Sequence, residues 1–155
     1  MAIVLKKAKE KDIPLLHGIQ QEAFAALLEY YQDYDTNPAA ETIERMYQKM
    51  CEPFTSYYLI MLDDVPIGGI RVCDFGQRCR ISPIFLLSNY QGRGYGQEAM
   101  YLAEKCHPNA TIWELDTILQ EEKLCRLYEK LGYQKAGKTN NIKDGMDIVF
   151  YEKII

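Results

Sequence analysis

The chain has 155 residues, of which 48% are apolar and 26% are charged, as is ordinary for a folded globular protein. This composition excludes wholesale disorder, and at this length we expect a single domain over residues 1–155 whose core needs no metal or disulfide. The formal net charge of −4 argues against nucleic acid as the main partner.

The use of cysteine and histidine points to a reducing compartment and to the absence of a metal site. The five cysteines are odd in number and form no CxxC pair, which favours free thiols in a cytosol. His17 and His107 are the only histidines, and neither has the spacing of zinc ligands. The apolar run at residues 1–5 is too short for a signal peptide, and no later run approaches a membrane span. We expect a soluble, cytoplasmic monomer or homodimer without metal, membrane or nucleic-acid partners.

The spacing of apolar residues divides the first half of the chain into strands and helices. Recurrence every three to four residues indicates a helix, whereas alternation or a short apolar run indicates a strand. In chain order we expect a strand at residues 3–5, a helix capped by Asp12 whose apolar stripe ends at Tyr30, a helix opened by Asn37 and Pro38, and a hairpin with strands at 56–62 and 65–74.

The second half of the chain continues this pattern around a strand expected to be buried on both faces. That strand, residues 79–87, is nearly all apolar, although Pro83 inside it removes a ladder donor and indicates a bulge or a lost partner. After it we expect a glycine-rich turn, a helix at 95–106, a strand at 111–117, a helix at 121–132, and a hairpin with strands at 133–139 and 146–153 around the turn NNIKDG.

The resulting order, β-α-α-β-β-β-α-β-α-β-β, predicts the fold class. It is α/β (α+β), with a mixed central sheet of six to seven strands and about four helices distributed over both faces.

The turn SNYQGRGYG, residues 88–96, places glycine at three alternate positions, Gly92, Gly94 and Gly96. Glycine loses more entropy on ordering than any other residue, so three of them in one turn require a reason. A strand, a glycine-rich turn and a helix create a helix N-terminus whose free backbone N–H groups suit an anion, phosphate above all. Neither the P-loop pattern nor the dinucleotide fingerprint fits this spacing. A tight turn without a ligand is the alternative.

Two motifs resemble the GCN5-related N-acetyltransferase superfamily. Gln91 to Gly96 match the family pattern Q/R-x-x-G-x-G/A, whose turn binds the pyrophosphate of acetyl-coenzyme A (acetyl-CoA). Downstream, LYEKLGYQKAG at residues 127–137 is similar to the family's LYEKLGF helix end. The element order also matches, so the resemblance covers essentially the whole chain.

The resemblance implies the acyl-CoA N-acyltransferase fold and acetyl-CoA as co-substrate. It implies that the backbone of one strand segment pairs with the pantetheine arm, namely that of Ile84, Phe85 and Leu86. The residues that it implies for the pyrophosphate turn are Gln91, Gly92, Arg93, Gly94, Tyr95, Gly96 and Gln97.

Two side chains are candidates for proton transfer. Tyr128 stands at the tyrosine position of the family's helix motif, which implies that it protonates the leaving coenzyme thiolate; from periodicity alone it is a core tyrosine, and the two interpretations are compatible. Asp116, twelve residues before it, is the candidate base, with Glu114 as its neighbour on the same face. Both acids are alternatively solvated charges at a strand end.

Two positions depart from the family pattern. Ser82 stands where many members carry a glutamate base, and serine is not a base unaided. Glu121 stands where an asparagine often contacts the coenzyme, and a carboxylate beside its phosphates is unfavourable, although at a helix N-terminus it can cap the dipole.

The acceptor region is expected between the first two helices and the closing hairpin. Residues 29–45 contain five acidic side chains and one base, together with Tyr30, Tyr31 and Tyr34, which we expect to contact the acceptor. Carboxylates beside aromatic faces suit a cationic amine, such as a polyamine, an aminoglycoside, or a lysine or N-terminal peptide amine. A solvated helix face with core tyrosines is the alternative.

The function expected from these features is acetyl-CoA-dependent N-acetylation of a primary amine by direct attack, without a metal. A non-catalytic acyl-CoA-binding regulatory module of the same fold is the main alternative, and an enzyme that binds another phosphate ligand is a third. The sequence leaves open the identity of the acceptor, the length of the acyl group and transfer to oxygen instead of nitrogen.

Overall fold

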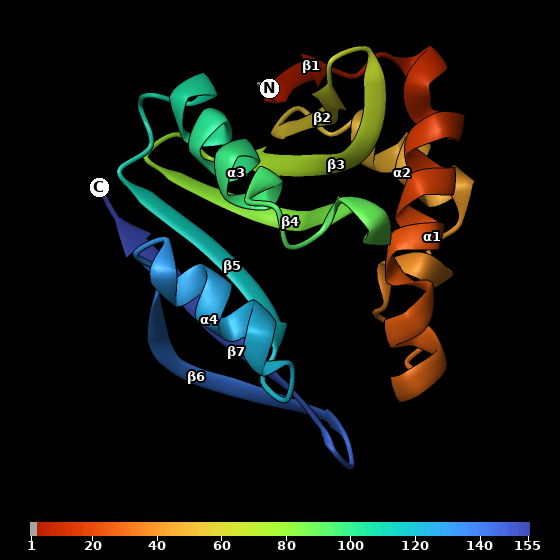
Figure 1. The fold of residues 1–155 in the computed structure, drawn as a ribbon. Coiled ribbons are helices and arrows are strands. Elements are labelled where there is room, and N and C mark those ends of the chain that lie inside the picture. Colours follow the sequence, from red (N-terminus) through yellow and green to blue (C-terminus); the bar gives the residue numbers. More distant parts are fainter. Residues whose placement is uncertain (1–2) are drawn as a thin grey trace.

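One mixed sheet of seven strands organises the protein (Figure 1). The structure is a computed structural model that describes residues 3–155. In spatial order the strands are β1 (Ile3–Lys7), β2 (Thr55–Leu62), β3 (Val65–Asp74), β4 (Arg78–Leu86), β5 (Ile112–Ile118), β7 (Met146–Ile154) and β6 (Gln134–Lys143). The four α-helices are α1 (Ile13–Tyr31), α2 (Ile43–Met50), α3 (Tyr95–Cys106) and α4 (Glu122–Lys130). The predicted fold class and order of elements are confirmed.

The helices cover both faces of the sheet in two pairs. On one face α1 and α2 pack over Tyr57, Leu59 and Phe85, which alternate with residues facing the other side. On the other face α3 and α4 enclose a larger core that includes Trp113 and Tyr128. Burying an aromatic or aliphatic side chain of this size contributes about 1.5–3 kcal/mol, so the larger core supplies most of the apolar stabilisation.

The two central parallel strands separate along their length, as Figure 1 shows for β4 and β5. They pair only through Arg78–Ile112, Cys79–Trp113 and Arg80–Glu114. Beyond this point β4 keeps only its partner β3, and β5 keeps only β7. The facing edges of the two strands are therefore open where β4 ends.

A bulge in β4 accompanies this separation. Ile70 of β3 pairs with Ile84, whereas Val72 pairs with Ile81, so β4 holds one extra residue at Ser82–Pro83. This confirms the irregularity predicted from Pro83. The expectation of burial on both faces was wrong for β4, because residues along the open edge are only partly covered.

Three local predictions were wrong because packing overrode the sequence pattern. Tyr30 is 78% exposed and Tyr31 is buried, so the buried stripe of α1, which includes Leu16 and Ile19 as predicted, ends at Tyr31 and not at Tyr30. Asn37 caps only a short 3-10 turn, and α2 begins after Thr42, whose hydroxyl accepts from the Arg45 N–H at 3.1 Å. Asp12 does not cap α1, since its carboxylate accepts instead from the Lys9 N–H at 2.8 Å.

The closing hairpin is longer and tighter than expected. Strand β6 continues through Lys143, so most of the predicted turn NNIKDG belongs to the strand. Asp144 and Gly145 alone make the connection, and Gly145 has a positive φ of 79°. All five cysteines are free. None of the helices within residues 3–155 is long and apolar enough to cross a membrane.

Candidate active site

The glycine turn presents unpaired backbone N–H groups at the start of α3. The first intrahelical hydrogen bond joins the Glu98 N–H to the Gly94 carbonyl at 3.1 Å. The N–H groups of Tyr95, Gly96 and Gln97 come before it and have no partner within the helix. The side chain of Gln91 donates to the Leu86 carbonyl at 2.9 Å, which fixes the turn against the end of β4. This arrangement suits an anion such as a phosphate.

Two of the three glycines are required by backbone conformation. Gly92 has a φ of 77° and Gly94 a φ of 85°, values that cost other residues about 1–2 kcal/mol. A Cβ atom added at either position would meet no atom of the protein within 4 Å. The turn is therefore exposed and uncrowded, which leaves room for a ligand to approach the backbone.

The open edge of β4 lies next to this turn. Ile84, Phe85 and Leu86 pair with β3 on one side and with no strand on the other. Gly68 and Gly69 let β3 approach this segment closely, since a Cβ at Gly68 would lie 2.1 Å from the Phe85 carbonyl oxygen. An extended backbone with one free edge suits a ligand that carries amide groups, such as the pantetheine arm of a coenzyme.

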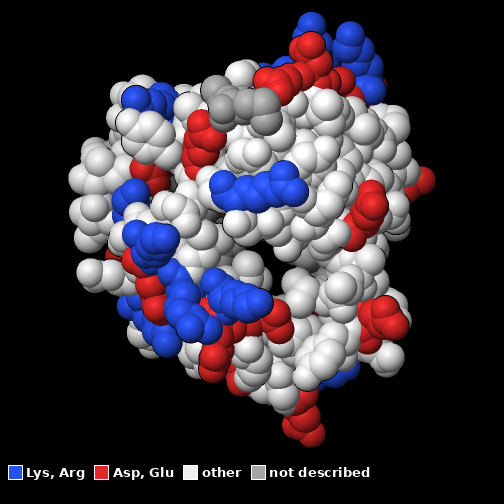
Figure 2. All heavy atoms as spheres, viewed as in Figure 1, with Lys and Arg blue, Asp and Glu red and all other residues white. Residues whose placement is uncertain are grey.

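The surface over the separated strands is hollowed. Figure 2 shows this hollow on the face that carries α3 and α4, with lysine and arginine side chains along its border. Helix α4 carries the basic residues Lys123, Arg126 and Lys130 and the acidic residues Glu122 and Glu129. The lysine and arginine side chains at the border favour an anionic ligand there, although the chain as a whole is acidic.

Tyr128 of α4 is buried in the core between two other tyrosine rings. Its ring centroid lies 6.4 Å from that of Tyr133 and 6.3 Å from that of Tyr151. Burial raises the pKa of Tyr128 to about 12, and the negative charge of Asp116 adds to this effect. The phenol therefore keeps its proton at neutral pH, which is the form in which a general acid acts.

Asp116 lies where the central strands part. Its carboxylate forms an ion pair with Arg80, which belongs to the last paired position of β4. Glu114 is bound by Arg78 in the paired part of the strands, and it is the less favourable of the two acids for a role at the opening. Ser82 lies in the bulge, where its carbonyl accepts from the Arg71 guanidinium at 3.1 Å.

Glu121, at the start of α4, contacts the end of α1, and the sequence did not predict this contact. Its carboxylate accepts a hydrogen bond of 2.6 Å from the hydroxyl of Tyr31, ninety residues earlier in the chain. Burial, followed by this hydrogen bond, raises the pKa of Tyr31. Glu121 thus holds the end of α1 against the start of α4.

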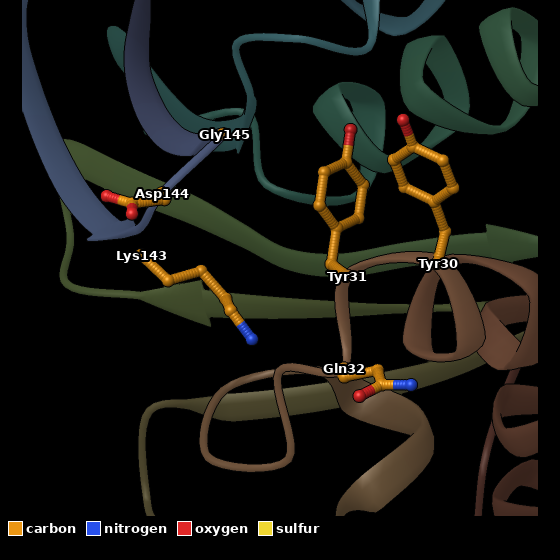
Figure 3. A pocket seen from close by; sticks show the side chains of 6 residues that line it. All are labelled: Tyr30, Tyr31, Gln32, Lys143, Asp144 and Gly145. Atoms are coloured by element: carbon orange, nitrogen blue, oxygen red, sulfur yellow. The ribbon is translucent and has the colours of Figure 1, made fainter.

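A first cavity lies between the end of α1 and the closing hairpin. It has a volume of about 380 Å³ and is lined by Tyr30, Tyr31, Gln32 and residues 143–145. Figure 3 shows the two tyrosine rings side by side and pointing the same way, with Lys143 extending toward Gln32 and Asp144 pointing away from the rings. The rings meet edge to face, with centroids 4.7 Å apart.

A second cavity lies under the loop between α1 and α2, and we call it the α1–α2 cavity. It has a volume of about 320 Å³, and Tyr34 lines it together with Ser82 and Pro83 of the β4 bulge. The three predicted acceptor tyrosines are therefore divided between two cavities. Gln20 also lines this cavity and was missed, although a polar residue within the apolar stripe of α1 was a readable signal.

Comparison with known proteins agrees with the fold and the motifs. A sequence model of the acetyltransferase (GNAT) family matches residues 21–133. An uncharacterized protein of Bacillus subtilis, YrkN, is 26% identical over 135 residues, which cover 84% of this chain and 72% of that protein.

Two solved structures have the same fold at low sequence identity. The ribosomal-protein-S18-alanine N-acetyltransferase of Escherichia coli superposes with a TM-score of 0.81 at 14% identity, over 99% of this chain and 94% of that one. The PaiA N-acetyltransferase of Thermoplasma acidophilum, in complex with coenzyme A, superposes with a TM-score of 0.75 at 17% identity over the full length of both chains.

Proposed function

This chain belongs to the acetyltransferase (GNAT) family and is an acetyltransferase, and we propose that it moves the acetyl group of acetyl-CoA directly to a primary amine. The separation of β4 and β5 carries this proposal, because it leaves a free strand edge that runs from the glycine turn to the point where Asp116 lies beyond the last paired residues. Residues 1–155 act as one domain in this proposal.

The donor substrate is bound by backbone groups at two places. The turn formed by residues 91–97 holds the pyrophosphate through the free N–H groups at the start of α3. The free edge of Ile84, Phe85 and Leu86 holds the pantetheine arm and places the thioester beside the bulge at Ser82–Pro83. A backbone N–H of this strand segment stabilises the negative charge that develops on the carbonyl oxygen during attack.

Two side chains manage the protons. An alkylamine with a pKa of about 10.4 is protonated at neutral pH, so Asp116 accepts a proton from it, directly or through a water, before attack. Tyr128 donates its proton to the sulfur as the carbon–sulfur bond breaks. The ammonium group loses two protons overall: Asp116 accepts the first before attack and releases it to solvent, and the second, lost from the attacking nitrogen, balances the proton that Tyr128 gives to the sulfur. The products are the N-acetylated amine and the free coenzyme thiol.

A thiol-release assay with acetyl-CoA and a panel of primary amines tests this proposal. We expect coenzyme A to be released only when an amine is present, with one acetylated product detected by mass spectrometry for each amine turned over. Tight binding of acetyl-CoA without turnover of any amine would favour the non-catalytic module instead. A rate equal for amines and for matched alcohols would point to transfer to oxygen.

A further inference from the structure

Few of the acidic side chains of residues 29–45 line the two cavities of the acceptor region. Among the five acidic side chains of residues 29–45, only Asp35 and Glu41 line a cavity. Asp33 is buried and engaged by its own turn, where it accepts from the Thr36 hydroxyl and from the N–H groups of residues 35 and 36 at 3.3 and 3.2 Å. The remaining two are exposed and line neither cavity. The two cavities therefore do not carry the excess of negative charge that the composition of residues 29–45 indicated.

The α1–α2 cavity contains as many basic as acidic side chains. Lys49 forms an ion pair with Glu41, and these side chains are only 20% and 12% exposed. Asp35 and Arg45 also line the cavity, and neither forms an ion pair within the described part of the chain, residues 3–155. The cavity thus offers one uncompensated charge of each sign.

A buried acceptor atom of a residue that lines the same cavity lacks a donor. Gln20 is fully buried, and its Nε2 donates to the Pro38 carbonyl at 2.9 Å and to Glu41 Oε1 at 3.1 Å. These two bonds fix the orientation of the amide, and its oxygen Oε1 has no hydrogen-bond partner among residues 3–155. Buried polar atoms are nearly always paired, so this oxygen indicates a ligand that brings an N–H or O–H donor.

The cavity also lies next to the proposed point of transfer. Ser82 and Pro83 of the β4 bulge form part of its lining, and the edge proposed to hold the donor begins at the next residue, Ile84. An amine bound here is close to the bulge where the thioester is placed.

We propose that the acceptor is a zwitterion of the amino-acid class, an amine that also carries a carboxylate. Its N–H groups face Gln20 Oε1 and Asp35, and its carboxylate faces Arg45, whose guanidinium is suited to binding a carboxylate through paired hydrogen bonds. A polyamine would place several positive charges beside Arg45 with a single unpaired acid to balance them. This inference rests on the proposed function, because it names the substrate class of the same site.

The transfer forms an amide in place of the thioester. The amine nitrogen bonds to the acetyl carbon, the carbon–sulfur bond breaks, and the thiolate receives one proton. The ammonium group loses two protons overall, of which one balances the thiol and one is released, and the acceptor carboxylate is unchanged.

The test compares amino acids with the amines that remain when their carboxylate is removed. We would titrate the full chain, saturated with coenzyme A, by calorimetry with L-lysine against cadaverine, L-arginine against agmatine and L-tyrosine against tyramine. At least one amino acid is expected to bind about tenfold or more tightly than its matched amine. In Arg45→Gln this preference should fall about tenfold, while the affinity for the amine changes by less than about twofold. Lys11→Gln, which removes an exposed cation outside the α1–α2 cavity, is the control and should preserve the preference.

The outcomes separate this inference from the proposed function. Three outcomes would overturn the assignment of a zwitterion as the acceptor. They are a preference for the decarboxylated amine in every pair, the absence of saturable binding by any of the amino acids, and an unchanged preference in Arg45→Gln. Turnover of amines under any of these outcomes would leave the acetyltransfer proposal standing. Binding of an amino acid without acetylation of that amino acid or of any other amine would contradict both the proposed reaction and the zwitterion as its acceptor.

Discussion

The pKa of Tyr128 determines the form in which this side chain acts. Burial of the phenol, together with the negative charge of Asp116, raises the pKa of Tyr128 to about 12, so the phenol is protonated throughout the neutral range. A general acid acts in its protonated form, and the raised pKa extends that form to higher pH. Arg80 holds the Asp116 carboxylate at the opening between the strands.

Replacing Asp116 tests its role as the base. We expect Asp116→Asn to lower kcat/KM about 10²-fold, because the ammonium proton then has no carboxylate to receive it. Glu114→Gln is the matched control, since it removes the neighbouring carboxylate and its ion pair with Arg78 but not the acid at the opening. Equal effects of the two substitutions on steady-state rates would show that Asp116 is only a charge at a strand end.

The glycine turn is the element that most directly determines which donor binds. Its positive φ angles at Gly92 and Gly94 direct backbone N–H groups outward at the start of α3, and the space around them is free of other side chains. The element acts through backbone geometry, so its function is sensitive to charge and conformation at a single position.

Substitution at Gly94 separates charge from conformation. Asparagine tolerates a positive φ and has nearly the shape of aspartate, so Gly94→Asn is the neutral control for Gly94→Asp. A negative charge about 5 Å from a phosphate costs about 3 kcal/mol near a protein surface, which corresponds to roughly 100-fold in affinity. We expect calorimetry to show coenzyme A binding weaker by about this factor in the aspartate variant than in the asparagine variant. Equal dissociation constants would contradict the assignment of the turn to the pyrophosphate.

At the scale of the whole molecule, a partly buried polar network joins the end of β3 to the end of α3. Asp74 accepts from the Gly76 N–H at 2.8 Å and pairs with His107 Nδ1 at 2.7 Å, and the other ring nitrogen is hydrogen-bonded to the Tyr58 hydroxyl at 3.0 Å. The backbone hydrogen bond from Gly76, assisted by His107, lowers the pKa of Asp74. The ionised carboxylate is therefore more favourable in the folded state than in the unfolded chain.

This shift predicts how stability depends on pH. A carboxyl group whose pKa is lowered on folding stabilises the fold above its unfolded value of 3.8, and this contribution is lost as the pH falls from there through the folded value. We expect urea unfolding to show wild type more stable than Asp74→Asn near pH 7, with the difference shrinking below about pH 4. A difference independent of pH would mean that the ionisation of Asp74 does not contribute.

The sequence predicted the features that depend on local pattern. The order of the elements follows from apolar spacing, and the glycine turn and the motif around Tyr128 are each contained in a short segment. The side chains that complete the site depend on distant partners, as with Tyr31 and Glu121, which are ninety residues apart in the chain. The start of α2 and the last buried residue of α1 were missed because caps and packing, which the pattern does not encode, determine them.

The most direct test of the account is the pH dependence of acetyl transfer in wild type and Tyr128→Phe. Phenylalanine keeps the ring packed against Tyr133 and Tyr151, so the fold and coenzyme binding should be preserved while kcat falls roughly 10- to 10⁴-fold. Tyr133→Phe is the control, because it removes a buried hydroxyl without a hydrogen-bond partner among residues 3–155. In wild type, no loss of activity should be assignable to Tyr128 below about pH 12, where its proton is retained. An unchanged kcat in Tyr128→Phe would contradict the account and show that this tyrosine has only a packing role in the core.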